Sequence, residues 1–477
     1  MKRPPASALL SESQIALFAD YYELTMAQAD ITDGNNATCT ANYFVRSIPQ
    51  GDYLIVAGLE QVIHYILNLR FSDADLAWLR ESQMVGNMSG DFVDYLCRFK
   101  FEGDIYAVPE GTPVFANEPL INVTGPTIDV QIFETYLLSV MNFQTLIATK
   151  TSRMIRAARG SACFDFGARR AHGRDAGILA ARASFIGGAA GTSLVIAGRY
   201  FDIPCVGTVA HKFIQDRPSE LEAFRAYAKA FPNNTVLLID TYDTIQGAKI
   251  ACHVGKEMEL QGYRLKGVRL DSGDLLKLSQ EVRSILDAAG LTYVQIFASG
   301  DLDEFKINQL MERNAPIDGF GIGTRLATGA NFNPLTGEGA VSALPGVYKH
   351  VERIDGSAVT PTIKLSDEPG KSTLPARKQV YRFHDAGGCY EKDLICLWGE
   401  SCQEGEGLLV PIVNQGKSVY YFPSLKELQA RATEELTKLP DHHKRFTDGE
   451  AYPVELSPQL EQLQRRLSRE SKSVPQN

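Results

Sequence analysis

Residues 141–345 alternate short apolar runs with segments of helical periodicity. Residues 236–239, 267–270 and 294–297 read as buried strands, and a helical pattern follows each of them. The helix after the second run ends at Gly290, where a C′ glycine belongs. This repeated order predicts parallel strands with right-handed crossovers. About six such units are clear, which predicts an α/β fold built on an irregular α/β barrel.

The preceding segment, residues 1–140, has a different pattern. Helical spacing covers residues 56–69 and 73–79, with Ser72 as the N-cap of the second helix. Residues 104–125 alternate apolar residues with Pro and Gly, which is typical of short strands and turns. This segment therefore reads as an α+β domain.

The last segment, residues 346–477, begins with strand patterns that run to about residue 409. A basic loop is expected at residues 364–378, and helices are expected at 425–438 and 458–468. The chain is thus predicted to divide near residues 140 and 345.

The composition argues against some classes of function. The net charge of −9 argues against general nucleic-acid binding, which needs a basic surface. No apolar run is long enough to cross a bilayer. The N-terminus from Met1 to Pro5 leads into no sustained apolar segment, so a cytoplasmic location is the default expectation.

Eight cysteines are scattered along the chain and form no C-x-x-C pair. His384, Cys389, Cys396 and Cys402 are close enough in sequence to consider zinc, but their spacing is not that of a common zinc knuckle. Reduced, mostly buried thiols are the favoured interpretation.

Polar residues follow the apolar runs of the middle segment. His211 comes shortly after the run at 203–206, which reads as a buried strand, and Asp240 and Asp271 follow two later runs. An α/β barrel displays its active site at the carboxyl ends of its strands. A lone histidine is more often structural, but this series favours a functional role for His211.

Basic residues concentrate in one window despite the acidic total. They are Lys150, Arg153, Arg156, Arg159, Arg169, Arg170 and Arg174. The first three arginines could form a solvated helical face, whereas Arg169 and Arg170 directly follow an apolar strand pattern. Because arginine favours bidentate contact with phosphate or carboxylate, the cluster indicates a polyanionic small molecule.

Two glycine turns suit phosphate, because their backbone N–H groups can approach an anion closely. They are Ser299-Gly300-Asp301 and Gly321-Ile322-Gly323-Thr324. Asp271 lies two residues after Arg269, so in a strand both would point the same way and could hold a substrate hydroxyl or Mg²⁺. Asp274 reads instead as a helix N-terminal acid.

Six ordered motifs resemble those of the nicotinate phosphoribosyltransferase family, a type II phosphoribosyltransferase family. They are residues 17–26 (LFADYYELTM), 166–173 (FGARRAHG), 191–193 (GTS), 207–211 (GTVAH), 269–274 (RLDSGD) and 321–324 (GIGT). The resemblance thins after about residue 380. It implies an irregular α/β barrel and a second α+β domain drawn from both ends of the chain.

The resemblance also implies a reaction. Nicotinate and phosphoribosyl pyrophosphate would give nicotinate mononucleotide and pyrophosphate, with Mg²⁺ as cofactor and coupled ATP hydrolysis through a transiently phosphorylated histidine. A homodimer with sites at the subunit interface is expected.

The resemblance assigns roles to residues of this chain. His211 would be phosphorylated, and Asp271 would contact ribose or its metal. Tyr22 and Phe166 would sandwich the pyridine ring. The other implied substrate contacts are Arg169, Ser193, Thr208 and Arg269, and the implied phosphate contacts are Ser299, Gly300, Gly323 and Thr324.

Several alternatives remain open. Ser193 favours nicotinate over nicotinamide, because the related nicotinamide enzymes carry an acid there that would repel a carboxylate. A quinolinate enzyme, a catalytically silent nucleotide-binding relative and a barrel aldolase are the other readings. Family members often carry Asn where this chain has Gly300, which leaves the details of phosphate contact open.

Overall fold

The computed structural model describes residues 15–48, 53–86, 88–330, 342–366, 371–447 and 449–473. The chain forms two compact units, one of residues 1–146 and 343–477 and one of residues 147–342. The division predicted near residues 140 and 345 differs from these limits by a few residues. Residues 1–5, which bear on the expected lack of a secretory signal, lie outside the described residues.

The unit of residues 147–342 is built on a curled sheet of parallel strands in the order β7-β6-β11-β10-β9-β8. The strands are β6 (Ala162–Asp165), β7 (Gly191–Thr192), β8 (Val236–Leu238), β9 (Gly267–Leu270), β10 (Gln295–Ser299) and β11 (Gly319–Ile322). β7 and β8 form the two edges of this sheet, so the sheet is a half-barrel. The predicted irregular α/β barrel is therefore confirmed, in an open form.

Helices connect these strands. They are η3 (Ala168–Arg170), α7 (Arg174–Ile186), α8 (Val195–Phe201), α9 (His211–Gln215), α10 (Glu220–Ala230), α11 (Thr244–Leu260), α12 (Leu275–Ala288), α13 (Glu304–Glu312) and α14 (Thr324–Ala327). The carboxylates of Asp243, Asp274 and Asp303 each cap a helix by accepting a hydrogen bond from a backbone N–H of the first turn. The prediction that Asp274 is a helix N-terminal acid is confirmed, and Gly290 has the expected left-handed conformation, with φ 70°.

One predicted strand of this unit is wrong. Residues 203–206 form only an isolated bridge between Cys205 and Thr192, and Pro204 and Cys205 are exposed. Proline has no N–H to donate, and the neighbouring strand β7 is only two residues long, so no ladder can extend.

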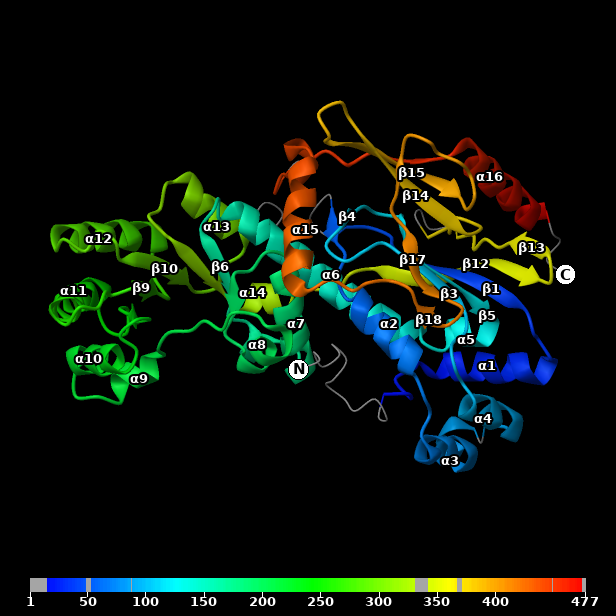
Figure 1. Cartoon of the computed structure of the whole chain (residues 1–477), viewed down its shortest axis with the longest axis horizontal. Helices are drawn as coiled ribbons and strands as arrows, with labels where there is room; N and C mark the ends of the chain where they lie inside the picture. Colours follow the sequence, from blue (N-terminus) through cyan, green and yellow to red (C-terminus); the bar gives the residue numbers. More distant parts are fainter. Residues whose placement is uncertain are drawn as a thin grey trace. The chain divides into compact units, whose positions relative to one another are not determined.

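The other unit holds sheets that are antiparallel except for the parallel pair of residues 390–397 with 454–456, and its largest sheet combines both ends of the chain. Its seven-stranded sheet has the order β13-β12-β1-β5-β3-β17-β18. The strands are β1 (Thr38–Val45), β3 (Asp104–Ala107), β5 (Pro119–Pro126), β12 (Gly346–Asp355), β13 (Ala358–Pro361), β17 (Val410–Asn414) and β18 (Lys417–Ser418). Figure 1 shows the blue strand β1 beside the yellow strand β12, with which it pairs.

A four-stranded sheet and a two-stranded one complete this unit. Their strands are β14 (Lys378–His384), β15 (Tyr390–Leu397), β16 (Glu406–Gly407) and β19 (Val454–Leu456), and β2 (Leu54–Ile55) with β4 (Pro113–Val114). Of the predicted basic loop, residues 367–370 lie outside the described residues, and Lys378 is buried in β14 rather than in a loop. Its ammonium donates to the carbonyls of Leu374 and Ala376, which explains how it can be buried.

The helices of this unit are α1 (Tyr21–Asp33), α2 (Leu59–Asn68), α3 (Asp73–Glu81), η2 (Gln83–Val85), α4 (Gly90–Cys97), α5 (Thr127–Gln131), α15 (Leu425–Lys438), η4 (Asp441–Lys444) and α16 (Pro458–Ser473). The N-cap predicted at Ser72 is present, and Asp75 completes a capping box with it. Helix α2 begins at Leu59 and not at residue 56, because Gly58 stands before it with φ 107°. α6 (Glu134–Ala157) begins in this unit and ends in the half-barrel unit.

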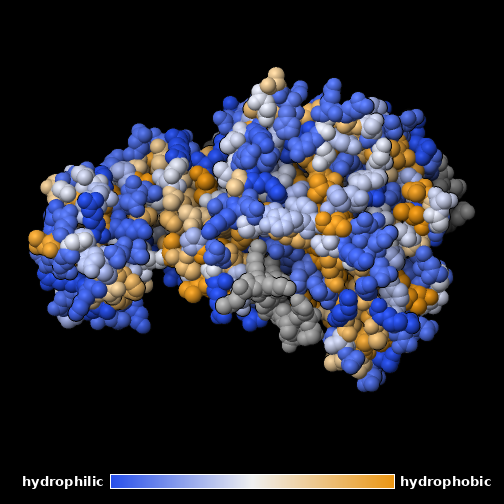
Figure 2. Space-filling model, viewed as in Figure 1, coloured by the Kyte–Doolittle hydropathy of each residue, from blue (hydrophilic) through white to orange (hydrophobic). Residues whose placement is uncertain are grey.

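Apolar faces of the helices supply the cores. In the half-barrel unit, α10, α11 and α12 bury residues such as Phe224, Val254 and Leu286 against the strands. The outer surface over these helices is mostly hydrophilic in Figure 2. Among the described helices, none is both long and apolar enough to span a bilayer.

Candidate functional site

Residues predicted to form the site gather where the parallel strands end. Asp271 follows β9, Gly300 follows β10, Gly323 follows β11 and Phe166 follows β6. Since parallel strands place their carboxyl ends on one edge of the sheet, these residues share that edge. The arrangement predicted from the sequence is therefore present.

His211 and Asp271 lie side by side at this edge. His211 is the first residue of α9, and its Nε2 lies 3.7 Å from Oδ2 of Asp271. Its Nδ1 lies 3.2 Å from the hydroxyl of Thr241. Ser299, at the end of β10, donates its hydroxyl to Oδ1 of Asp271. About two fifths of the His211 side chain is exposed (41%), so the imidazole is held but accessible.

The loop after β8 orders its neighbours. Oδ2 of Asp240 accepts hydrogen bonds from the backbone N–H of Asp271, at 2.8 Å, and from the hydroxyl of Ser272, at 2.7 Å. Thr241, the next residue, contacts His211. Sequence reasoning singled out Asp240 but missed Thr241, whose only signal was its place beside a strand-end acid.

Arg269 points from β9 toward the loop that carries His211. Its guanidinium donates to the carbonyl of Val209 at 3.2 Å. Burial lowers the pKa of Arg269, and the carboxylates of Asp271 and Asp240 partly oppose this shift. The side chain therefore fixes the 207–211 segment as well as offering a positive charge.

A cavity of about 330 Å³ occupies the concave side of the half-barrel. Three predicted site residues line it, namely Phe166, Thr208 and Arg269. Gly321 is required beside the aromatic ring, because a Cβ at that position would lie 2.5 Å from two ring carbons of Phe166. A cavity of this size can hold a small aromatic molecule.

Asp165 locks the ends of β6 and β7 together. Its buried carboxylate accepts from the hydroxyl of Thr192 at 2.7 Å and from the N–H of Gly167 at 2.8 Å. Its backbone carbonyl accepts from the N–H of Ser193 at 2.8 Å. Burial raises the pKa of Asp165, and these hydrogen bonds oppose the shift. These hydrogen bonds hold the backbone next to Arg169 and Ser193, whose side chains are exposed. Sequence reasoning missed this role of Asp165.

The predicted phosphate contacts lie in two turns. Ser299 is buried, its hydroxyl is engaged by Asp271 and it pairs with Gly321 in the sheet, so its contact with phosphate stays a prediction. Gly300 is exposed with φ 105°, and Gly323 precedes the exposed Thr324 at the start of α14. Both turns can present N–H groups to an anion.

Part of the predicted basic cluster has a different role. Lys150 and Arg153 of α6 are buried, and both pair with the buried carboxylate of Glu304 on α13. Arg159, which follows the end of α6, has its guanidinium 3.5 Å from the carboxylate of Glu312 on α13. Lys150 and Arg153 therefore join α6 to α13 and are not available to a polyanion, contrary to the expectation for the cluster. The solvated helical face expected for Arg153, Arg156 and Arg159 is wrong for the buried Arg153, whereas Arg159 is exposed.

Tyr22 belongs to the other compact unit, in the first turn of α1, and 44% of its surface is exposed. Its stacking opposite Phe166 therefore stays a prediction.

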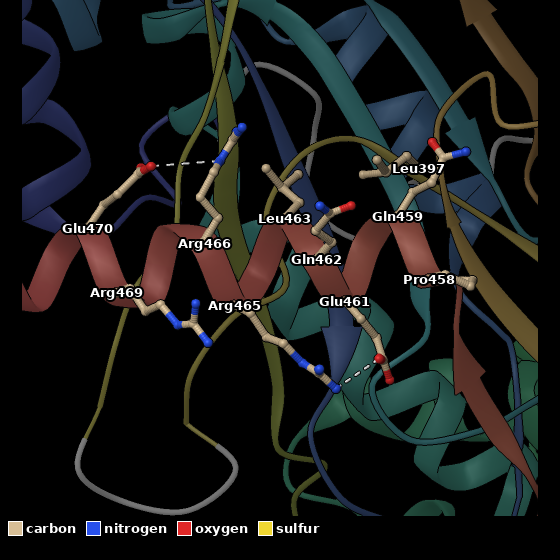
Figure 3. Close-up of a pocket in the computed structure, with 10 residues that line it drawn as sticks. All are labelled: Leu397, Pro458, Gln459, Glu461, Gln462, Leu463, Arg465, Arg466, Arg469 and Glu470. Carbon is tan, nitrogen blue, oxygen red and sulfur yellow. Dashed lines mark hydrogen bonds and ion pairs between the residues drawn. The ribbon is translucent and has the colours of Figure 1, made fainter.

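Near α16 of the same unit, a hollow of about 920 Å³ contains arginines that pair with acids on the same helix, Arg465 with Glu461 and Arg466 with Glu470 (Figure 3). None of the predicted site residues lines it.

The residues at the barrel edge fit Mg²⁺. Asp271 offers a partly exposed carboxylate, and the buried Oδ1 of Asp240 has no hydrogen-bond partner in the described part of the chain. Magnesium prefers one or two carboxylates together with substrate phosphates.

Among the described residues, no group of three or more His, Cys, Asp or Glu side chains could hold a metal alone, at the cysteines or elsewhere. All eight cysteines are free, and half of them are buried: Cys39, Cys163, Cys252 and Cys396.

A half-barrel with these residues at its carboxyl edge belongs to the class of type II phosphoribosyltransferases. Three family models match the chain: the nicotinate phosphoribosyltransferase N-terminal domain over residues 17–142, the nicotinate phosphoribosyltransferase family over residues 161–389, and the C-terminal domain over residues 403–464. The chain therefore belongs to the nicotinate phosphoribosyltransferase family. The resemblance is expected from the motifs to thin after about residue 380, but the C-terminal domain model still matches residues 403–464.

Individual proteins similar to this chain belong to the same family. The chain is 40% identical to nicotinate phosphoribosyltransferase pncB2 of Mycobacterium tuberculosis, covering 93% of this chain and 92% of that protein. It is 36% identical to the Bacillus subtilis nicotinate phosphoribosyltransferase, covering 94% of each. The crystal structure of human nicotinic acid phosphoribosyltransferase superposes with a TM-score of 0.81 at 28% identity, covering 94% of this chain and 100% of that one.

Proposed function

We propose that this protein joins nicotinate to phosphoribosyl pyrophosphate, releasing nicotinate mononucleotide and pyrophosphate, and couples the reaction to ATP hydrolysis through a phosphorylated His211. Membership of the family supports the transferase reaction, an entry step to NAD. The observation that carries the ATP coupling is the accessible imidazole of His211 beside the carboxylate of Asp271.

The imidazole has the surroundings of a nucleophile. If Nδ1–H donates to Thr241, the lone pair of Nε2 is left free on the side of Asp271. Attack of Nε2 on the γ-phosphorus of ATP forms an N–P bond, breaks the P–O bond to ADP and leaves phosphohistidine. Hydrolysis of that bond restores the imidazole and releases phosphate. Mg²⁺, held by Asp271 and Asp240 with the substrate phosphates, would neutralise phosphate charge.

The transfer step needs positioning and charge. Departure of pyrophosphate leaves an oxocarbenium-like centre at ribose, to which the pyridine nitrogen of nicotinate bonds. Phe166 would contact the ring from the cavity wall, and Tyr22 would cover its other face. Arg169 and Ser193 would lie toward the carboxylate. Phosphate and ribose would contact Thr208, Arg269, Ser299, Gly300, Gly323 and Thr324.

The alternative substrate is nicotinamide. Ser193 is exposed at the carboxyl edge and carries no charge, so it would not repel the carboxylate of nicotinate. This supports nicotinate as the substrate.

The test measures product from nicotinate and from nicotinamide, each with and without ATP. We expect ATP to accelerate nicotinate mononucleotide formation and to leave acid-labile, base-stable phosphate on the protein. His211→Ala should abolish both effects, whereas His253→Ala, at an exposed histidine of α11, should change neither. Loss of phosphate labelling with intact ATP stimulation in His211→Ala would contradict the coupling, and no product at all would favour a nucleotide-binding relative.

We also propose that the protein works as a homodimer in the cytoplasm, as the resemblance to the family implies. Light scattering of the purified chain should give twice the mass of 52.5 kDa, and a monomer mass in an active preparation would contradict the dimer.

A further inference from the structure

Two cations lie beside one carboxylate, next to the turns that are expected to contact phosphate. Asp301 follows Gly300 after β10, and its Oδ1 lies 3.5 Å from Nε of Arg325 on α14. Its Oδ2 lies 3.8 Å from Nζ of Lys306 on α13, and the same ammonium donates to the backbone carbonyl of Asp301 at 2.9 Å. The two cations outnumber the carboxylate they share, so this group is positively charged.

Arg325 reaches from one of these turns to the other. β10 and β11 are neighbouring parallel strands, and Ser299 pairs with Gly321 near their carboxyl ends, so the turns that follow them are neighbours too. Arg325 comes directly after Thr324 of the second turn, and its guanidinium lies beside Asp301 of the first turn. The side chain therefore bridges the two turns.

The pair of Arg325 and Asp301 is loose. Nε of Arg325 is buried, yet it makes no hydrogen bond within the part of the chain that the structure describes. The side chain of Asp301 is 60% exposed, and exposed ion pairs contribute little to stability. The guanidinium is therefore held at the turns without strong commitment to Asp301.

We infer that Arg325 binds a phosphate of phosphoribosyl pyrophosphate, with Lys306 adding positive charge beside it. This inference rests on the proposed function, in which the two turns contact substrate phosphate. A planar guanidinium donates two parallel hydrogen bonds to phosphate, and such charge-assisted bonds are stronger than those from neutral N–H groups. Asp301 holds both cations near the turns before the substrate arrives, which lowers the cost of ordering them on binding.

Calorimetry of the full chain with phosphoribosyl pyrophosphate and Mg²⁺, without nicotinate or ATP, tests the inference. Arg325→Ala should weaken binding about ten- to hundredfold, as expected for loss of a charge-assisted hydrogen bond. The KM for this substrate should rise by a similar factor, with kcat and the KM for ATP within about threefold. Arg313→Ala, at an exposed arginine that follows α13, is the matched control and should bind as the original protein does.

Two conservative variants refine this test. Arg325→Lys should recover part of the affinity, because it keeps the charge but loses the planar geometry. Arg325→Gln keeps much of the side chain but not the charge, so it should lose as much affinity as Arg325→Ala. It decides the matter if the alanine variant does not fold.

A double variant separates phosphate binding from charge balance. Asp301→Asn removes the carboxylate and keeps the turn, because asparagine tolerates the φ of 47° at this position. If Arg325 contacts phosphate, adding Arg325→Ala to Asp301→Asn should still weaken binding at least tenfold. If Arg325 only balances the charge of Asp301, the double variant would bind as tightly as Asp301→Asn alone, and that result overturns the inference.

The source of the phosphate is tested by the two KM values. A rise in the KM for ATP with an unchanged KM for phosphoribosyl pyrophosphate overturns the inference, as does an unmodified protein that does not bind phosphoribosyl pyrophosphate. Failure of the proposed function is distinct, because calorimetry needs no turnover. In that case the unmodified protein would bind phosphoribosyl pyrophosphate and form no nicotinate mononucleotide.

Discussion

Replacing Gly300 by alanine should damage both stability and activity. Gly300 has φ 105°, and a Cβ added there would lie 2.2 Å from the carbonyl oxygen of Asp271. Alanine at such a φ costs about 1–2 kcal/mol, and the clash adds about 1–2 kcal/mol because a backbone atom must move. The sum predicts a fall in Tm of about 4–16 °C if this unit unfolds as one domain of 150–250 residues.

The same displacement should also lower the rate of the reaction. Relieving the contact requires a shift of about 1 Å, given ordinary contact distances. The atom displaced belongs to Asp271, whose carboxylate faces His211. A misplacement of about 1 Å can cost up to about a hundredfold in rate, so kcat should fall at least tenfold.

Gly262→Ala is the matched control for this prediction. Gly262 also has a positive φ, 79°, but a Cβ added there would meet nothing within 4 Å. Gly262→Ala should lose only the conformational part of the stability, about 1–2 kcal/mol, and keep full activity. Equal falls in Tm for the two variants, or full activity in Gly300→Ala, would refute the reasoning.

Three further changes give distinct outcomes. Ser193→Asp should raise the KM for nicotinate about tenfold by charge repulsion, and unchanged steady-state kinetics would contradict the role of Ser193. Glu304→Gln removes the buried carboxylate charge that pairs with Lys150 and Arg153 and should destabilise by about 3–5 kcal/mol in chemical denaturation, whereas Glu312→Gln, at an exposed ion pair, should cost less than about 1 kcal/mol. Burial raises the pKa of Glu23 from 4.5 to about 7, so the folded protein keeps a proton that the unfolded chain has lost, and stability falls as pH rises between these values. The gain in Tm of Glu23→Gln over the original protein should therefore grow across that window and flatten above pH 7, and a constant difference would count against it.

Local signals in the sequence predicted much of the half-barrel. Asp243 and Asp274 stand where each helix begins, and short apolar runs mark β8, β9 and β10. These features depend on neighbours within a few residues, so the sequence carries them directly. The strand predicted at residues 203–206 does not form, because a strand also needs a neighbouring strand to pair with, and β7 offers only two residues.

Long-range pairing limited the prediction of the site. The spacing of Arg153, Arg156 and Arg159 suggested a solvated helical edge, but Arg153 is buried and its partner, Glu304, lies on α13, far along the chain. Asp165 stood in the sequence as one acid among arginines, and only the fold brings Thr192 to its carboxylate. Charge clusters read along a sequence therefore overestimate the number of residues available to a ligand.

The position of His211 shows what the fold adds to the motif. No strand precedes His211 directly in the described part of this loop, so its place at the barrel edge depends on contacts from elsewhere. Arg269 of β9 holds the carbonyl of Val209 two residues before it. Two adjacent residues of the loop after β8 do the rest, because Asp240 holds the backbone of Asp271 and Thr241 contacts the imidazole. One short loop therefore sets the separation between the proposed nucleophile and its carboxylate, which makes Asp240 and Thr241 positioning residues even though neither needs to react.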